Sequence, residues 1–149
     1  MAIARGAGTE IIRSAHFEDV DSTQAVLIFG EQHHIYNVLS VICFVTAIQA
    51  AGNFFQLSIL GYDSTGGTTD QAIAIATQDM TLNSTFVWND KFSFNGHEPV
   101  DFTATMDSIA KQNAIADQGS AVPQYLRCKA EHADDSFEAT VTYIDQNNS

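Results

Sequence analysis

The sequence predicts an all-β domain: an antiparallel β-sandwich, jelly-roll-like, with about seven to nine short strands and at most one short helix. The clearest observation is the period-two alternation of apolar and polar side chains on both sides of a polar turn within Gln124–Asp145. Such alternation is typical of half-buried antiparallel strands. In addition, Gly, Asn and Asp turns separate the apolar segments, and the helices that an α/β layout needs between strands are lacking.

The N-terminal segments set the beginning of the domain. Small residues in Met1–Gly8 predict an extended arm, and Thr9–Phe17 predicts a first strand. Asp19–Ser22 has turn chemistry, because Asp and Ser side chains bond their own backbone. Gln24–Phe29 predicts the next strand, which ends at Gly30.

His34–Ile48 is long for a strand, but its β-branched and aromatic residues argue against a helix. Apolar side chains fall on both parities between Val38 and Val45. A strand that is buried on both faces, or that a neighbouring subunit covers, has this pattern.

The middle of the chain predicts two further strands, Phe54–Tyr62 and Gln71–Thr77, joined by a glycine-containing turn at 63–68. Leu82–Trp88 and Lys91–Phe94 follow as two strands or as one uninterrupted strand. The second alternative stays open because the aromatic residues of both segments share one parity.

Between residues 98 and 122 the pattern is loop-like, with one short helical candidate at Met106–Ala116, whose apolar spacing is close to helical. Residues 1–14 are then an N-terminal arm or first edge strand, and residues 15–149 are a single sandwich domain. A chain of 149 residues is long enough for a core without disulfide staples.

The charge balance excludes some partners. Eighteen acidic residues stand against six basic ones, a net charge of −12, so the surface repels a polyanion and we expect no nucleic-acid partner. The longest apolar run, Val38–Ile48, is too short to span a bilayer. No apolar segment of the kind found in export signals follows Met1–Gly8, so we expect neither a membrane partner nor export.

The candidate chemical groups favour no catalytic, cofactor or metal site. His33 and His34 are adjacent, so on a strand they point to opposite faces, and no metal-ligand spacing of His or Cys occurs. Cys43 and Cys128 lie on apolar segments and are expected to be buried free thiols, although a single bridge between them is possible. Asp134 and Asp135 lie in a turn and lack the further oxygens of a calcium site.

Several segments carry a resemblance to a known family. Met1–Ser14 looks like an arm laid along a neighbouring subunit, and His34–Cys43 is similar to a contact strand with a two-sided apolar run. Thr85–Phe94 looks like a segment that crosses between the sheets, and Thr140–Ser149 ends a closing hairpin. Together they resemble the small β-sandwich virion proteins of tailed bacteriophages, above all the capsid decoration (cement) proteins.

The resemblance implies a structural, non-enzymatic virion protein without cofactors, made in the host cytoplasm and located on the capsid surface. Copies would form a homo-oligomer, a trimer, and would stabilise the capsid by bridging subunits of the major capsid protein. Arm position and apolar excess lead us to expect partner contacts at Ile3, Arg5, Ile11, Ile12, Arg13, Tyr36, Phe54 and Phe55.

Three alternatives remain. The chain could be a structural protein associated with a phage neck, tail or fibre. It could be a carbohydrate-binding β-sandwich module that presents Tyr62 or Trp88 to sugars. A glycosidase is the most distant alternative, because its paired carboxylates can be found only from their separation in space.

Overall fold

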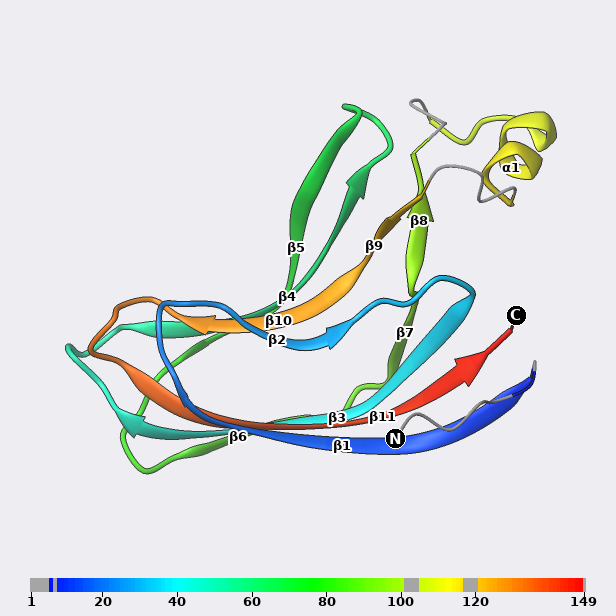
Figure 1. The fold of residues 1–149 in the computed structure, drawn as a ribbon. Helices are drawn as coiled ribbons and strands as arrows, with labels where there is room; N and C mark the ends of the chain where they lie inside the picture. Colours follow the sequence, from blue (N-terminus) through cyan, green and yellow to red (C-terminus); the bar gives the residue numbers. More distant parts are fainter. Residues whose placement is uncertain (1–5, 7, 101–104, 117–120, 149) are drawn as a thin grey trace.

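The computed structural model of the protein describes residues 6, 8–100, 105–116 and 121–148 (Figure 1). Its helix is α1 (Ile109–Ala116). Its strands are β1 (Thr9–Val20), β2 (Ala25–Phe29), β3 (His34–Ala47), β4 (Phe54–Asp63), β5 (Thr68–Asp79), β6 (Thr85–Trp88), β7 (Phe92–Asn95), β8 (His97–Pro99), β9 (Ala121–Pro123), β10 (Tyr125–Ala130) and β11 (Ser136–Asn147). The predicted all-β class is confirmed. The structure has more strands than predicted, because it adds β8 and β9, two strands of only three residues each.

Two antiparallel sheets face each other across one core. The first sheet has the strand order β1-β11-β3-β6, with β7 also paired to β3, and the second sheet has the order β2-β10-β4-β5. Each sheet therefore interleaves strands from the beginning and the end of the chain, and most connections pass from one sheet to the other. This is the arrangement of a double-sheet jelly roll. The predicted jelly-roll-like sandwich is confirmed.

The predicted closing hairpin is wrong, although both of its strands exist. β10 pairs with β2 and β4 in the second sheet, whereas β11 pairs with β1 and β3 in the first. The turn at 131–135 therefore arches over the edge of the core. Alternation reports only that one face of each strand is buried, so two strands facing each other across a core have the same pattern as two paired strands.

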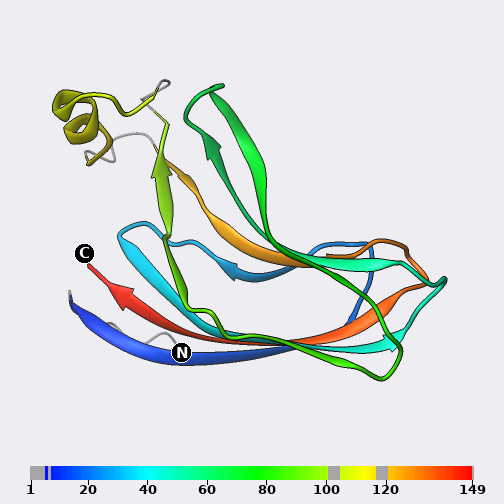
Figure 2. The same ribbon diagram turned by 180° about the vertical axis from the view of Figure 1, so that it is seen from behind.

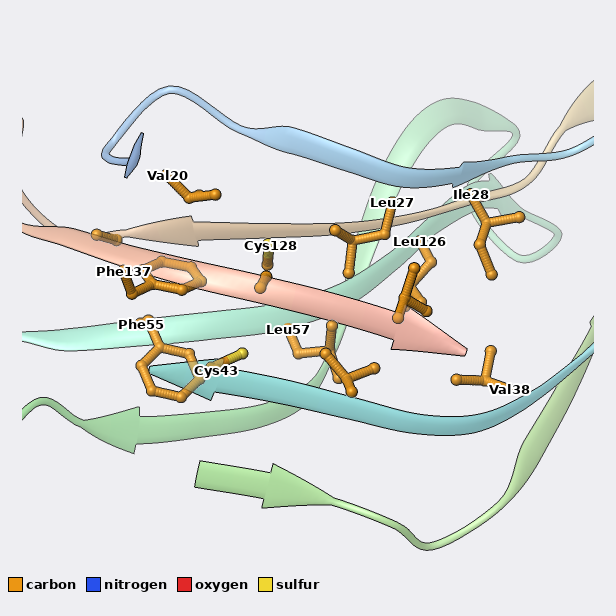
Figure 3. Packing of buried hydrophobic residues seen from close by; sticks show 14 of the residues in the cluster. Val20, Leu27, Ile28, Val38, Cys43, Phe55, Leu57, Leu126, Cys128 and Phe137 are labelled. Carbon is orange, nitrogen blue, oxygen red and sulfur yellow. The ribbon is translucent and has the colours of Figure 1, made fainter. Parts of the chain in front are cut away.

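The core fills the space between the sheets (Figure 3). Phe55 and Leu57 reach it from the second sheet, and Val38 and Phe137 reach it from the first, each at most 1% exposed. The rings of Phe55 and Phe137 lie 5.0 Å apart between centroids. This contact joins the sheets through apolar burial, the main stabilising contribution to a sandwich.

The apolar run from Val38 to Val45, which has apolar residues on both parities, lies in β3. Its inward residues, including Val41, Cys43 and Val45, are 1% exposed, whereas Ile42 on the outward side is 40% exposed. Among the described residues, burial of both faces of β3 therefore does not occur. Coverage of the outward face by a neighbouring subunit stays a prediction.

β6 and β7 form two strands rather than one, because the chain leaves the sheet between Trp88 and Phe92. Phe86 pairs with Cys43 and Phe94 pairs with Tyr36, so the aromatic residues of both strands face inward. Both strands pair with β3 and stay in the first sheet. The expectation that this segment crosses between the sheets is therefore wrong. Two strands that pair one after the other with the same edge of β3 also place their aromatic residues on one side, so the shared parity does not require a crossing.

The turns before β2 and after β4 form where the sequence predicts turn chemistry. The backbone N–H of Thr23 donates to Asp21 Oδ1 at 2.7 Å, and the N–H of Thr65 donates to Asp63 Oδ1 at 2.9 Å. β1 continues past the predicted end at Phe17 as far as Val20, with an irregularity in its register where Asp19 has a positive φ of 53°. The first strand is therefore longer than predicted and ends against the turn.

The β8–β9 ribbon leaves the sandwich at a crowded crossing of three chain segments. The N–H of Gly30 donates to the carbonyl of Gln124 at 2.8 Å, and the N–H of Gln124 donates to the carbonyl of Gly96 at 2.9 Å. A Cβ on Gly30 would lie 2.0 Å from the Gly96 oxygen, and one on Gly96 would lie 1.8 Å from the Glu31 oxygen. Only glycine fits this close approach of backbones.

Beyond this crossing, β8, β9 and α1 project on the side of the second sheet, as does the far end of the β4–β5 hairpin (Figure 1). The view from behind shows the same arrangement (Figure 2). The predicted helix is confirmed, and it begins at Ile109 rather than Met106 because Ser108 acts as its N-cap: the N–H of Lys111 donates to Ser108 Oγ at 3.2 Å.

Candidate assembly interface

The outward side of the first sheet is built from directly paired residues of neighbouring strands. Residues that stand opposite each other in a ladder share a face. Since Tyr36, Val41 and Cys43 point into the core, their sequence neighbours Asn37, Ser40 and Ile42 point outward. The ladder registers then place the outward residues in rows across the strands.

Three consecutive rows contain no Asp, Glu, Lys or Arg. The paired residues of these rows are Ile12, Ile144, Asn37 and Ser93; Ser14, Thr142 and Ser40; and His16, Thr140, Ile42 and Val87. We call this set the uncharged face. For a chain with a net charge of −12, such a region is unusual, because surfaces of soluble proteins normally intersperse charges.

The uncharged face presents large apolar side chains to solvent. Ile12 is 71% exposed, Ile42 is 40% exposed and Val87 is 50% exposed. Between them, Ser14 Oγ and Thr142 Oγ1 lie 3.0 Å apart, and His16 Nδ1 lies 2.9 Å from Thr140 Oγ1. These cross-strand hydrogen bonds use up polar groups of the face within the sheet itself.

No described element packs over the uncharged face. The described projections, α1 and the β8–β9 ribbon among them, lie beyond the second sheet (Figures 1 and 2). Acidic residues occur at its margins: Glu10 pairs with Gln146, Glu138 pairs with Phe44, and Glu18 Oε1 lies 3.7 Å from His16 Nε2. The result is an open apolar and hydroxyl-rich surface with a charged border, the pattern of a surface that another protein covers.

The outward side of the second sheet has a different composition. Arg127 and Lys129 of β10 point outward opposite Ser58 and Gln56. The Arg127 guanidinium donates to Ser58 Oγ at 3.0 Å and to Gln24 Oε1. This sheet therefore carries charges along β10, and its exposed Phe29 stacks on Tyr125 of the same strand.

A polar cluster, buried at His34 and Asp145 and half-exposed at Arg13, lies at the end of the sandwich where β3 begins. His34 Nδ1 lies 2.6 Å from Asp145 Oδ1, and Arg13 Nε lies 3.3 Å from Asp145 Oδ2. The backbone N–H of Glu31 donates to the Tyr36 hydroxyl at 3.0 Å, and burial raises the pKa of Tyr36 to about 12. These contacts tie β1, β3 and β11 together, and they give His34 the structural role that its sequence context favours.

A second buried polar cluster surrounds Asp135, which is fully buried. Its carboxylate accepts the backbone N–H groups of Gln49 and His132, at 2.7 and 3.1 Å, and the Asn53 amide at 3.1 Å. Burial alone would raise the pKa of Asp135, but these hydrogen bonds hold the pKa below its ordinary value. Asp135 thus joins two loops, and its oxygens are occupied by donors of the chain itself.

Both thiols are buried and unbridged, as predicted. Burial raises the pKa of Cys43 to about 12 and raises the pKa of Cys128 further, with the neighbouring Cys43 as a second cause. Both groups are therefore protonated and unreactive in the folded chain.

The structure distributes the predicted contact residues among different environments. Ile12 lies on the uncharged face, while Ile11 and Arg13 take the opposite parity of the same strand. Tyr36 and Phe55 belong to the core, and Phe54 is half-buried. Two further predicted contacts, Ile3 and Arg5, lie outside the described residues.

Sequence reasoning missed most of the uncharged face. Ile144 and Val87 stand in segments whose alternation is plain, but alternation does not say which parity faces the core. The signal that was available is the two-sided run from Val38 to Val45, which contains Ile42. That run predicted a covered outward face on β3, and the coverage stays a prediction.

The residues of the alternative functions are placed as follows. Trp88 packs partly against the core, and its indole N–H donates to the Asp90 carbonyl at 2.8 Å, so it offers no open platform for a sugar. Tyr62 lines a surface pocket. Among the described residues, no three His, Cys, Asp or Glu side chains converge as metal ligands, and none of the helices there is long and apolar enough to cross a membrane.

Comparison with known proteins identifies no family. No family model matches the chain, and no curated protein matches it. Among solved structures, a chain of the disulfide-linked pili of Bacillus endospore appendages aligns over 100% of this chain and 97% of its own, with 14% identity and a TM-score of 0.41.

Two viral chains also align. One, from the T13 IBDV viral particle, shows 11% identity and a TM-score of 0.42 over 99% of this chain. The other, from the infectious bursal disease virus Gx strain, shows 8% identity and a TM-score of 0.36 over 98% of this chain. This chain spans only 37% and 39% of the lengths of those two chains. These similarities are too distant to say what the protein does.

Proposed function

We propose that the protein is a non-enzymatic structural subunit of a virion, a capsid decoration protein that lies with its uncharged face against the major capsid protein. The observation that carries this proposal is the set of three charge-free rows on the open side of the first sheet. Large exposed apolar side chains on an otherwise acidic protein are stabilised when a partner removes them from water.

The dimensions of the first sheet suit such a contact. Strands rise about 3.4 Å per residue and lie about 4.8 Å apart, so the outward side of four strands of this length measures about 40 by 19 Å. That is an area of roughly 750 Å², close to the ~800 Å² that each partner buries in a standard interface. The interface would therefore cover the whole outward side of the first sheet, and not only the uncharged face at its centre.

The distribution of acidic residues favours one orientation of the protein on the capsid. The acidic residues lie outside the uncharged face and keep the exposed side of the protein soluble. Many copies repeated over a capsid lattice reinforce a moderate single contact through avidity. In this arrangement the segment before β1, with Ile3 and Arg5, reaches a neighbouring subunit, and three copies surround a junction between capsid subunits.

The test is attachment to purified capsids that lack the protein, combined with light scattering of the protein alone. The variant Ile42→Lys places a charge in the middle of the uncharged face and is expected to lower the affinity by roughly 100-fold, because an unpaired charge becomes buried. The matched control Thr77→Lys places the same charge on the exposed β5 strand and is expected to attach as the unmodified protein does.

Both variants should keep the thermal unfolding midpoint of the unmodified protein. Equal attachment of the two variants would contradict the assigned face. A protein that stays monomeric and does not attach to capsids would contradict the decoration role itself. A few copies per particle instead of many would place the protein in the neck or tail.

A further inference from the structure

The projecting ribbons enclose a pocket that the proposed docking does not use. It lies between the β4–β5 hairpin and the β8–β9 ribbon and has a volume of about 370 Å³. Gly61, Tyr62, Gln71, Ile73, Glu98 and Gln124 are among the residues that line it. Its walls come from segments far apart in the sequence, so the tertiary fold alone creates it.

Glu98 of β8 is held in a fixed position on one wall. Its Oε2 atom accepts the backbone N–H of Tyr62 at 2.7 Å and the side-chain amide of Gln124 at 2.7 Å. A Cβ on Gly61 would lie 2.6 Å from this oxygen, so the glycine in β4 provides the room that the carboxylate needs. Within the described chain no hydrogen bond reaches the second oxygen, Oε1, which is left to accept a bond from a ligand.

The rest of the lining combines amide groups with apolar surface, beside the hydroxyl residues Tyr62 and Ser64 and a second carboxylate, Asp63, whose Oδ1 accepts the Thr65 N–H. Gln71 donates through Nε2 to the Thr69 carbonyl at 3.1 Å, which orients its amide and leaves its oxygen as an acceptor. Ile59 and Ile73 supply the apolar part, and Ile73 is 73% exposed, a high value for an isoleucine on a strand. Oriented polar groups beside an apolar wall are the usual composition of a small-molecule site.

We propose that this pocket binds a neutral saccharide. The ring hydroxyls donate to Glu98 Oε1 and to the glutamine oxygens, and the C–H face of the sugar ring packs on Ile73. A metal ion fits less well, because one carboxylate oxygen of Glu98 is already saturated by two donors and the described residues supply no converging set of ligands.

The β4–β5 hairpin and the β8–β9 ribbon, whose residues line the pocket, project on the side of the second sheet, away from the first sheet that carries the uncharged face (Figure 1). If the proposed function holds, the bound sugar therefore faces away from the capsid and belongs to the surroundings of the particle. The orientation rests on the proposed function, whereas sugar binding by the isolated protein does not.

The experiment is a titration of the ¹⁵N-labelled protein with glucose, galactose, N-acetylglucosamine and their disaccharides, followed by NMR. We expect at least one of these sugars to shift the amide signals of Gly61, Gln71 and Gln124 together. Glu98→Gln keeps an oxygen that can accept both internal hydrogen bonds and replaces Oε1 with an amide donor, so it should weaken binding about tenfold without unfolding the protein.

A matched pair of variants separates the pocket from the strand. Gln71→Ala should weaken sugar binding several-fold, whereas Gln78→Ala, on the same strand outside the pocket lining, should leave binding unchanged. The proposal is overturned if no sugar shifts these signals. It is also overturned if arginine amide or lysine amide produces the same shifts and sodium chloride abolishes them, because the pocket then binds a cation. Neither result affects capsid attachment, so the two proposals fail separately.

Discussion

The outward sides of the two sheets follow the same strand alternation but present different chemistry. On the first sheet, Ile12, Ile42 and Val87 stand among Ser, Thr and Asn, with acidic residues only at the margin. On the second sheet, Arg127 and Lys129 occupy the central strand. Folding requires only that the inward sides be apolar, so it does not explain this difference. The difference is the one we expect if, as proposed, the first sheet meets a partner while the charged second sheet stays in water.

The largest expected effect concerns the core that both faces share. Phe137→Ala should lower the free energy of unfolding by about 3–5 kcal/mol, because Phe137 is fully buried against Phe55. Its neighbour Glu138 points outward, so Glu138→Ala should change the free energy by less than about 0.5 kcal/mol. Urea unfolding followed by circular dichroism measures both. Similar losses for the two variants would contradict the assignment of inward and outward sides.

The next effect concerns Asp135, which connects the loop after β3 with the loop before β11. Asp135→Asn removes a buried charge that accepts several hydrogen bonds and should lower stability by about 2 kcal/mol at neutral pH. Because the pKa of Asp135 is lower in the folded chain than in the unfolded one, its contribution is present above about pH 4 and is lost as the pH falls through the folded value.

The unfolding midpoints of the unmodified protein and of Asp135→Asn should therefore converge as the pH falls below about 4. A constant difference between their midpoints over the whole pH range would show that Asp135 does not act through its charge.

A smaller change sharpens the comparison of the faces directly. Ile12→Ser should leave the stability of the isolated protein within about 0.5 kcal/mol, since Ile12 is 71% exposed. It should nevertheless weaken attachment to capsids about tenfold, because an apolar side chain that the partner would bury is missing. Sedimentation of capsids with bound protein measures this effect. Unchanged attachment would exclude Ile12 from the interface.

The smallest expected effect on capsid attachment concerns the second sheet. Arg127→Ala removes the hydrogen bonds to Gln24 and to the buried Ser58, and should lower stability by about 1 kcal/mol. Attachment to capsids should not change, because this side faces solvent in the proposed arrangement. A loss of attachment larger than that of Ile12→Ser would reverse the assignment of the two faces.

Local patterns predicted the strands well and their neighbours poorly. The alternation in β10 and β11 identifies both strands, and the shared parity of Phe86 and Phe94 places both on one side. The same alternation wrongly suggested a hairpin. Pairing is decided by contacts between distant residues, such as Val41 with Val141, and no local pattern contains this information.

The candidate site divides in the same way. Ile12 could be predicted as a contact only from arm position and apolar excess, and its role as a contact stays a prediction. Ile144 and Val87 could not, since they join Ile12 and Ile42 on one face only through the ladders of β1, β11, β3 and β6. The pocket around Glu98 likewise depends on Gly61 and Gln124, which come together only in the folded chain.

By itself, the sequence determined the all-β class, most strand positions, the short helix, the acidic surface and the buried thiols. These depend on residue type and on periods of two or of about 3.6 residues, which act over a few neighbouring positions. Only the tertiary structure decided the jelly-roll strand order, the side of each strand that faces outward and the residues that gather on the uncharged face. The physical reason is that apolar burial stabilises any strand order that removes one side of each strand from water. Which strand order forms therefore depends on how segments distant in the sequence pack together.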